Sequence, residues 1–482
     1  MKMNKTFKTK WSSSRQQYII TDEKHVLKGK ASKNTVTLAI SAVLAIASGT
    51  SAAAYVEKGV VGNQASWESA EYQKDWGLAA MNAVKVYSLG FSGQNVAVGV
   101  MDSGALLQKH PELAGNRFHA SSAQGKYGST GNRYQTGVRG IGDVFKNGDY
   151  KEGESFNLDG NFIAEKNDTH GTHVTGTVGA NRDGSEFHGV AWGANVYVGN
   201  SGGTDNTNYG PFQDYKYFHA AWSSLAQDLI AANGTERGGV INNSFGTNLR
   251  YGASGGTSLP VNSTAQTEYE YFLFKQVYGD KKTFVDAAWD AVKGTNVVQV
   301  FTTGNRDFAN PYYRPLYPYF SPEAERNWIA VAGLQKDGVG TDGKDTYKWI
   351  SNFNEAGNAK WWTIAAPGRD IYSSIVYDDH YEDTDALHPL GTPGYASYGG
   401  TSMAAPHVSG AMTVLMSRYQ DMNAIQVRDI LFTTARHINT DGSLFTGWTA
   451  EDGVPDVLYG WGTPDLDKGM FGPSQLLGKF EY

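Results

Sequence analysis

The stretch from Gly399 to Gly410, GGTSMAAPHVSG, carries a serine at the start of a run of small and apolar residues. The run predicts a buried helix that begins close to Ser402. Because the first backbone N–H groups of a helix have no partner inside it, the N–H of Ser402 is available to an anionic oxygen.

Two other stretches each carry one reactive residue at the end of an apolar element. NDTHGTHVTGTVGA, residues 167–180, opens a small-residue helix at His170, and VAVGVMDSG, residues 96–104, ends an apolar run at Asp102. A serine hydroxyl is a weak nucleophile near neutral pH until an imidazole takes its proton, and a buried carboxylate holds that imidazole in the required tautomer. Asp102, His170 and Ser402 therefore predict a site for acyl transfer.

An acyl-transfer site also needs donors for the oxyanion that develops during attack, and each donor contributes about 3 kcal/mol. Asn305 ends the apolar run VVQVFTTGN at residues 297–305 and is the predicted side-chain donor. The backbone N–H of Ser402 is the predicted second donor.

From Gln94 onward, short apolar runs alternate with helical or Gly-rich stretches, and runs of this length bounded by turn residues suit strands buried on both faces. The predicted strands lie within residues 95–104, 189–199, 238–246, 297–305, 328–334 and 361–368, and two further helices are predicted at Phe218–Asn233 and Thr283–Lys293. This alternation predicts an α/β fold with three layers, in which helices cover both faces of a mainly parallel central sheet. Reactive groups then collect at the carboxyl ends of the strands.

The order Asp, His, Ser along the chain resembles that of the subtilisin-like serine peptidases, the subtilases, and differs from the chymotrypsin and α/β-hydrolase orders. DSG, HGTHVTG, GTSMAAPHVSG and the Gly304-Asn305 pair each resemble a subtilase signature, and the resemblance extends over about Gly90 to Gly469. It implies a subtilisin-like fold, with Asp102 as the orienting carboxylate, His170 as general base and then acid, Ser402 as nucleophile and Asn305 as oxyanion donor.

The same resemblance implies two walls for a bound substrate. Ser244, Phe245 and Gly246 resemble the edge that pairs with an extended substrate, and Thr302, Thr303 and Gly304 resemble the opposite wall of the primary specificity pocket. An edge that recruits a peptide through backbone hydrogen bonds predicts polypeptide substrates.

Two other functions compete with a peptidase. An adhesin or binding passenger on a subtilase scaffold would use the long insertions for binding, but a pure binder would not need all three reactive residues. An esterase or lipase would need a different residue order and a G-x-S-x-G motif, whose last position is occupied here by Ala404.

The charge of the chain is unevenly distributed. Residues 1–33 hold nine Lys or Arg and two acidic residues, whereas residues 55–482 hold 32 basic and 46 acidic residues. An acidic body repels phosphates and anionic lipid head groups, so no nucleic-acid partner is predicted. The 482 residues include no cysteine, which excludes disulfides, a cysteine nucleophile and thiolate metal ligands.

The N-terminus predicts export. The apolar run TVTLAISAVLAIA at residues 35–47 follows a basic region and precedes Ser51-Ala52-Ala53-Ala54, which fits the cleavage rule of signal peptides. The long region before the apolar run resembles the extended signal of autotransporters of Gram-negative bacteria. This resemblance implies a secreted or cell-surface protein and an outer-membrane translocator barrel that is not present in this chain.

We therefore expect an extended signal peptide at residues 1–54, an N-terminal approach segment at 55–89, a peptidase domain at 90–470 and a tail at 471–482 that leads to a missing downstream part. Three stretches are interpreted as insertions, namely Ser121–Glu165, Arg250–Tyr269 and Tyr377–Ser397. They are expected to line or cover a cleft, and the alternative is that they only decorate the surface, which accepts insertions freely.

No cofactor is required for the predicted chemistry. Many subtilases carry structural calcium, and the acidic residues Asp378, Asp379, Glu382 and Asp383 could supply its oxygen ligands. His170 and His173 lack a third ligand, so no other metal site is predicted. His173 and His407 are interpreted as packing residues inside their helices, and Asp168 is expected to face the cleft.

Overall fold

The computed structural model describes residues 7–12, 17–22, 59–132, 149–164, 167–201, 214–245, 281–378, 382 and 384–472. Several predictions fall outside these residues: the signal cleavage site, Gly246, the insertion at 250–269, Asp379, Asp383 and the end of the tail. Among the described helices, none is both long and apolar enough to span a membrane.

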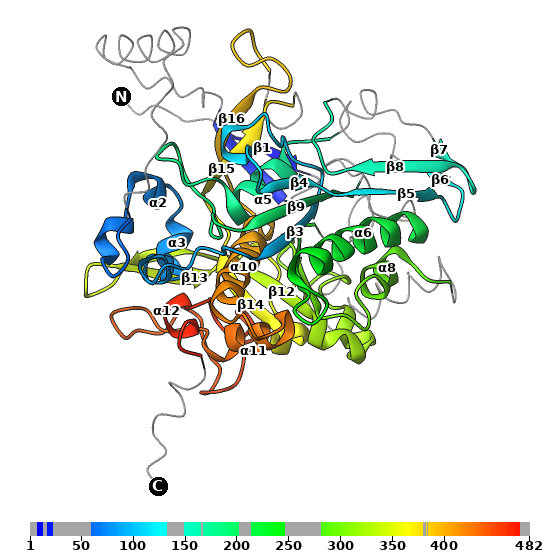
Figure 1. The fold of residues 1–482 in the computed structure, drawn as a ribbon. Coiled ribbons are helices and arrows are strands. Elements are labelled where there is room, and N and C mark those ends of the chain that lie inside the picture. Colours follow the sequence, from blue (N-terminus) through cyan, green and yellow to red (C-terminus); the bar gives the residue numbers. More distant parts are fainter. Residues whose placement is uncertain are drawn as a thin grey trace.

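A central sheet runs through the protein (Figure 1). Its strands lie in the order β13 (Asp345–Trp349), β12 (Trp328–Val339), β11 (Val297–Thr302), β10 (Gly239–Asn243), β3 (Ala97–Asp102), β9 (Asn195–Asn200) and β4 (Phe118–Ala120), and β14 (Thr363–Pro367) also pairs with β12. Every neighbouring pair is parallel except β12 with β13. The predicted mainly parallel sheet is confirmed, and all six predicted strands belong to it.

Strands β3, β10 and β11 lie in the middle of the sheet, and most of their residues are apolar. Every residue of these three strands is buried, as expected for parallel strands that are covered on both faces. Glycine allows a helix to come close at one point, since a Cβ on Gly99 would lie 3.1 Å from Cγ of Leu225.

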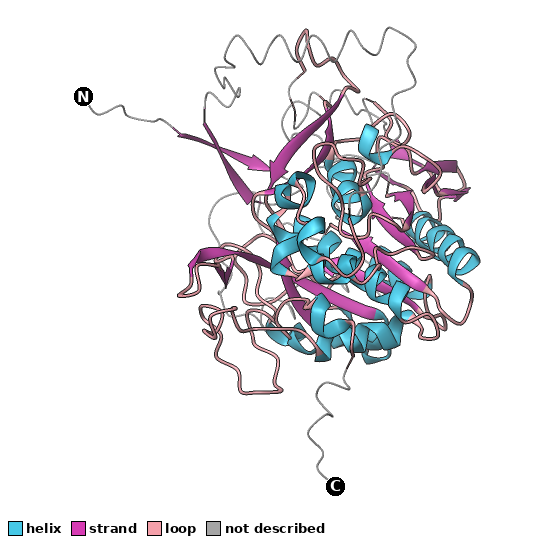
Figure 2. Ribbon diagram, turned by 60° about the vertical axis from the view of Figure 1, so that its left-hand side comes forward, coloured by secondary structure: helices cyan, strands magenta, loops and turns pink. Residues whose placement is uncertain are grey.

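Helices cover both faces of the sheet (Figure 2). On one face α5 (His170–Gly179) packs against α10 (Thr401–Arg418), and α11 (Ala424–Thr433) packs against α10. On the other face α6 (Tyr215–Asn233) packs against α8 (Phe284–Asp290). The predicted three-layer α/β architecture is therefore confirmed, and the two predicted helices correspond to α6 and α8.

The segment before the sheet is folded onto the body of the domain. It contains η1 (Gln64–Trp67), α2 (Ala70–Lys74), α3 (Trp76–Ala80) and α4 (Ala83–Ser88). Trp76 Nε1 donates to the carbonyl of Arg369 at 2.9 Å, and Asn82 Nδ2 donates to Asp465 Oδ1 at 3.0 Å, just before α12 (Leu466–Gly469). The two ends of the described domain are thus in direct contact.

Two of the predicted insertions contain strands. In the first, β5 (Ser122–Lys126) pairs with β8 (Ser155–Asp159), and β6 (Gly131–Asn132) pairs with β7 (Asp149–Tyr150). This arm packs on α6, where Ser224 Oγ donates to the carbonyl of Ser122 at 2.5 Å. In the third, the prediction is wrong for its last residues, because β16 (Pro393–Tyr398) pairs with β15 (Ile371–Val376) along its whole length.

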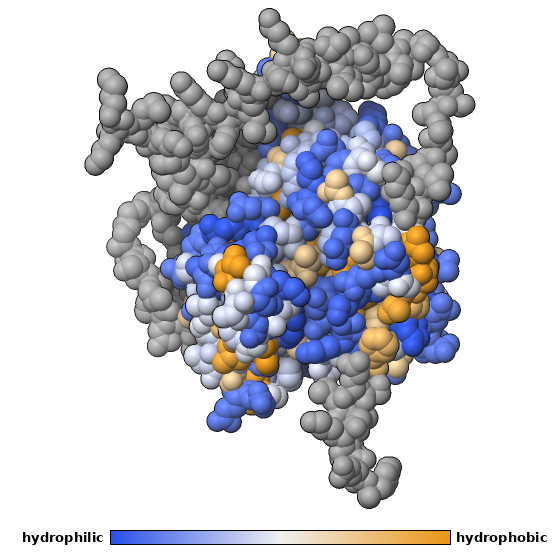
Figure 3. Space-filling model, turned by 90° about the vertical axis from the view of Figure 1, so that its left-hand side faces the viewer, coloured by the Kyte–Doolittle hydropathy of each residue, from blue (hydrophilic) through white to orange (hydrophobic). Residues whose placement is uncertain are grey.

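The remaining described elements are short. They are β1 (Phe7–Ser12) and β2 (Gln17–Asp22), which pair antiparallel, together with η2 (Pro111–Leu113), α9 (Tyr317–Phe320), η4 (Pro322–Asn327) and η5 (Gly357–Trp362). The face shown in Figure 3 is mostly hydrophilic, and its apolar residues form small separate groups.

Candidate active site

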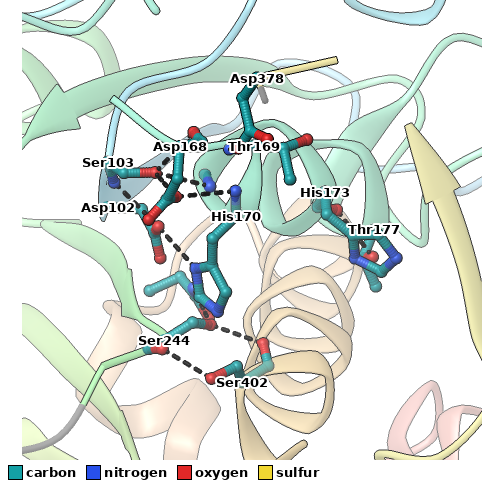
Figure 4. A network of polar contacts seen from close by, with 12 residues as sticks. Asp102, Ser103, Asp168, Thr169, His170, His173, Thr177, Ser244, Asp378 and Ser402 are labelled. Atoms are coloured by element: carbon teal, nitrogen blue, oxygen red, sulfur yellow. Dashed lines mark hydrogen bonds and ion pairs between the residues drawn. The ribbon is translucent and has the colours of Figure 1, made fainter. Parts of the chain in front are cut away.

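Asp102 and His170 meet at the carboxyl end of the central strand. Asp102 is the last residue of β3, and His170 is the first residue of α5. His170 Nδ1 lies 2.8 Å from Asp102 Oδ1, and both side chains are buried. In the view of Figure 4 the His170 ring lies between Asp102 and Ser402. A carboxylate at Nδ1 favours the tautomer in which Nδ1 carries the proton and Nε2 can accept one.

A hydroxyl next to Asp102 fixes the start of α5. Ser103 Oγ donates to Asp168 Oδ1 at 2.8 Å and accepts the N–H of Gly171 at 2.9 Å. The contact is close, because a Cβ on Gly171 would lie 2.2 Å from the carbonyl oxygen of Gly104. The turn after β3 and the first turn of α5 therefore hold Asp102 and His170 in one geometry.

The expectation that Asp168 faces the cleft is wrong. Asp168 is fully buried, and its Oδ1 accepts the backbone N–H of His170 at 2.9 Å as well as the Ser103 hydroxyl. The first N–H groups of a helix need such acceptors. Asp168 therefore stabilises the start of α5, and the carboxylate at the His170 ring is that of Asp102.

Ser402 is the second residue of α10 and lies against the end of β10. Its Oγ donates to the carbonyl of Ser244 at 2.8 Å, and Ser244 Oγ donates to the carbonyl of Ser402 at 2.7 Å. Pro406 explains the second bond. A proline has no N–H, so it cannot donate to the carbonyl four residues earlier, which is that of Ser402.

Asn305 caps α10 from outside the helix. Its Oδ1 accepts the N–H of Thr401 at 2.8 Å and the Thr401 hydroxyl at 2.9 Å. The amide nitrogen is thereby turned toward Gly400, on which a Cβ would lie 3.3 Å from Asn305 Nδ2 and 3.6 Å from the backbone N of Ser402. The two predicted oxyanion donors thus border the same space beside Gly400.

The predicted pocket wall adjoins the start of α10. Gly304 donates its N–H to Thr401 Oγ1 at 3.2 Å, and Thr303 donates its N–H to the carbonyl of Val331 at 3.0 Å. Thr302, Thr303 and Gly304 are all buried, and so are Ser244 and Phe245. The structure therefore brings five of the six predicted substrate-binding residues to this region, and the sixth, Gly246, is not described.

The acidic loop after β15 does not fit a calcium site in its described part. Asp378 Oδ2 accepts the N–H of Thr169 at 2.7 Å, Asp378 Oδ1 accepts the N–H of Glu382 at 3.2 Å, and Glu382 Oε1 accepts the hydroxyl of Tyr398. Within the described ranges, no three His, Cys, Asp or Glu side chains are grouped to hold a metal ion. Asp378 instead supports the residue that precedes His170.

His173 and His407, the two histidines that were interpreted as packing residues, have different environments. His173 is buried, its Nε2 lies 3.1 Å from the carbonyl of Ile371, and its ring stacks on Tyr398, as a packing residue would. The interpretation of His407 as a packing residue is incomplete, because its Nε2 lies 2.9 Å from a carboxylate oxygen of Asp75.

Sequence reasoning missed two contributors to this site, Ser103 and Thr401, and also missed Asp75, the buried partner of His407. Ser103 and Thr401 lie inside the quoted motifs, next to Asp102 and Ser402, and a search for hydroxyls beside the reactive residues would have found them. Asp75 lies far from every motif, and the sequence gives no local signal for it.

A carboxylate–imidazole pair beside a serine at a helix start, with two donors bordering one space, defines a site of the serine hydrolase class. The chain belongs to the subtilase family, whose sequence profile matches residues 93–462.

Three relatives show the range of the similarity. The chain is 27% identical over 466 residues to an extracellular serine protease of Serratia marcescens, covering 89% of this chain and 37% of that protein. It is 25% identical over 422 residues to the Neisserial autotransporter lipoprotein NalP of Neisseria meningitidis, covering 82% of this chain and 34% of that protein. It is 26% identical over 366 residues to subtilisin DY of Bacillus licheniformis, covering 75% of this chain and 92% of that protein. The chain thus spans about a third of the length of the first two relatives.

Proposed function

We propose that this protein is a secreted serine endopeptidase that hydrolyses peptide bonds through an acyl-enzyme at Ser402. The observation that carries the proposal is the 2.8 Å contact between Asp102 Oδ1 and His170 Nδ1, made beside the serine that begins α10. Membership of the subtilase family and the similarity to an extracellular serine protease support it.

The proposed reaction starts from the Ser402 hydroxyl. Rotation about Cα–Cβ exchanges the Ser244 carbonyl for His170 Nε2 as the hydrogen-bond acceptor of Oγ. His170 then takes the proton while Oγ bonds to the carbonyl carbon of the scissile peptide bond, and Asp102 stabilises the imidazolium. Asn305 Nδ2 and the N–H of Ser402 donate to the oxyanion.

Release of the products uses the same groups. His170 returns the proton to the leaving amine as the C–N bond breaks, which leaves an ester on Ser402. A water molecule then gives a proton to Nε2 and attacks the ester carbonyl, and Oγ leaves with the proton that His170 holds.

Polypeptides are the proposed substrates. Ser244 to Gly246 would pair with the extended chain of the substrate, and Thr302 to Gly304 would form the opposite wall of its primary pocket. The bonds from Thr303 and Gly304 to Val331 and Thr401 support this role, because they hold that wall in a fixed position beside Ser402.

We further propose that residues 1–54 direct export, that residues 55–89 precede a peptidase domain at 90–470, and that the tail leads toward an outer-membrane translocator. The support is the basic and apolar pattern of the N-terminus and the similarity to an autotransporter lipoprotein. The protein would then act outside the cell or on its surface.

Labelling with a fluorophosphonate probe tests the proposed chemistry. The probe reacts only with a serine whose proton is removed by a neighbouring base, so we expect a single adduct at Ser402 by peptide mass mapping. His170→Ala should abolish the adduct, and His173→Ala, which changes a histidine on the same helix, should retain it. A folded wild-type protein that stays unlabelled would contradict the proposal.

Asn305 offers a second test of the reaction. We expect Asn305→Leu to lower kcat about 10²- to 10³-fold with little change in KM, because a neutral side chain without a donor leaves only the Ser402 N–H for the oxyanion. Since Asn305 also caps α10, thermal unfolding should be measured in parallel. Asn305→Asp retains the cap and loses the donor, so an unimpaired kcat in that variant would contradict the assignment.

A further inference from the structure

A buried His–Asp pair joins the N-terminal segment to the helix of the nucleophile. His407 Nε2 lies 2.9 Å from Asp75 Oδ2, and the two side chains are 0% and 2% exposed. Asp75 lies between α2 and α3 and precedes the residues that match the subtilase profile. The family match therefore says nothing about this contact.

Both nitrogens of the His407 ring face acceptors. Nδ1 lies 2.7 Å from the carbonyl of Met403, which can only accept, and Nε2 faces the Asp75 carboxylate. Burial alone would lower the pKa of His407, but the Asp75 carboxylate and the two hydrogen bonds outweigh it and raise the pKa. Because both ring nitrogens face acceptors, the geometry fits a ring that carries a proton on each nitrogen and donates in both directions.

The first turn of α10 depends on side chains for its backbone contacts. Thr401 is bound through its N–H by Asn305, the carbonyl of Ser402 is bound by Ser244, and the carbonyl of Met403 is bound by His407. Each of the three consecutive residues around the nucleophile is therefore bound by a different side chain, which comes from outside the helix for Thr401 and Ser402 and from α10 itself for Met403. His407 is the partner that carries a charge, and Asp75 fixes its ring.

The N-terminal segment fits closely around this ring. Asp75 Oδ1 accepts the N–H of Gly77 at 2.8 Å and so caps α3. A Cβ on Gly77 would lie 2.2 Å from His407 Nε2, so only glycine leaves room for the ring at this position. Asp75 is therefore held by its own helix and cannot turn away from His407 without releasing that cap.

We propose that Asp75 and His407 are positioning residues that orient the first turn of α10, and with it the Ser402 Oγ, for attack on the substrate. This inference rests on the proposed peptidase function. It differs from a purely stabilising role, because removing the pair would slow the chemical step in protein that is still folded. Small displacements of a reacting atom are known to have such effects, since a shift of about 1 Å can lower a rate about 100-fold.

The test replaces Asp75 by asparagine in the full chain. We expect Asp75→Asn to lower kcat for peptide hydrolysis, and the rate of fluorophosphonate labelling at Ser402, about 10- to 100-fold. KM should stay within about twofold, because no group that binds substrate is changed. Rates are measured at a temperature at which thermal unfolding shows the variant to be folded.

Tyr87→Phe is the matched control. Tyr87 is buried in the same segment and donates its hydroxyl to the carbonyl of Val190 at 2.6 Å, so the substitution also removes one buried anchor. Val190 packs against Gly410 in the middle of α10 and not against its first turn, so the contacts around Ser402 are left unchanged. Its kcat should equal that of the wild type. A kcat for Asp75→Asn that equals the Tyr87→Phe value would overturn the positioning role.

A double variant covers the case in which Asp75→Asn is unstable because it leaves a buried charge unpaired. The double variant Asp75→Asn, His407→Gln has no charged side chain left at this pair. We expect its kcat to be lowered about as much as in either single variant, because the two residues act as one unit. A double variant with wild-type kcat would overturn the proposal.

The outcome for the wild type separates this inference from the proposed function. If folded wild-type protein neither labels nor hydrolyses peptides, both fail. If it labels at Ser402 and hydrolyses peptides while the Asp75 and His407 variants react at the same rates, the positioning role alone fails.

Discussion

Ser402→Ala should abolish almost all hydrolysis of peptide substrates, with kcat falling about 10⁶-fold. The substitution removes the oxygen that forms the acyl bond, whereas Asp102, His170 and the oxyanion donors remain and can give only slow attack by water. The measurement is the release of a fluorophore from a quenched peptide. The concentration of active wild-type protein is determined by fluorophosphonate labelling.

The fold should survive this change. Ser402 Oγ donates a hydrogen bond to the carbonyl of Ser244, so we expect its loss to lower the free energy of unfolding by about 1 kcal/mol. Ser417→Ala is the matched control, since Ser417 lies on the same helix and donates to the carbonyl of Val414, and it should keep wild-type kcat. Hydrolysis at the parental rate by Ser402→Ala would show that another residue is the nucleophile.

Asp102→Asn is expected to lower kcat about 10⁴-fold near neutral pH. Asparagine keeps the shape of the side chain, but its amide can donate to Nδ1 and then stabilises the tautomer whose proton is on Nε2. That tautomer cannot accept the proton of Ser402. Initial rates against peptide concentration give kcat and KM, and circular dichroism checks that the variant is folded.

Asp168→Asn provides the comparison for Asp102→Asn. Asp168 contacts Ser103 and the backbone of His170 rather than the His170 ring, and asparagine retains an oxygen that can accept both contacts. We expect kcat to fall less than about 10-fold in this variant, since only the start of α5 is perturbed. A larger loss in Asp168→Asn than in Asp102→Asn would reverse the assignment of the orienting carboxylate.

The sheet could be predicted from the sequence because parallel strands buried on both faces leave a simple pattern. The runs that end at Asp102, Ser244 and Asn305 became β3, β10 and β11, side by side in the middle of the sheet. Their order along the sheet is not encoded in any single run. It follows from crossovers through α5 and α6, which only the three-dimensional structure gives.

The reactive residues could also be predicted, because each stands at a fixed place in a short motif. Their supports were harder to predict. The sequence predicts a cleft position for Asp168, because no local pattern indicates that the hydroxyl of Ser103, from another element, donates to it inside the protein. The pair Asp75 and His407 is separated by 332 residues, so no local pattern relates its two members.

The insertions show a different limit. The acidic, turn-rich stretch Tyr377–Ser397 was interpreted as an insertion, but its last residues belong to a strand, since Pro393 to Tyr398 pairs with Ile371 to Val376 along its whole length. Its alternation of apolar and polar residues is weak, and its stability comes from the partner strand. Propensity alone therefore placed this boundary incorrectly.

The contact between the two ends of the domain has a consequence for how the chain folds. Asn82 and Asp465 are hydrogen-bonded although they are 383 positions apart in the sequence, and Asp75 and His407 are in contact although they are 332 positions apart. Contacts of such high order close large loops and form late. During synthesis, the first turn of α10 therefore reaches its final geometry only after nearly all of the domain has emerged. Under the proposed function, a growing chain would therefore be inactive as a peptidase until then.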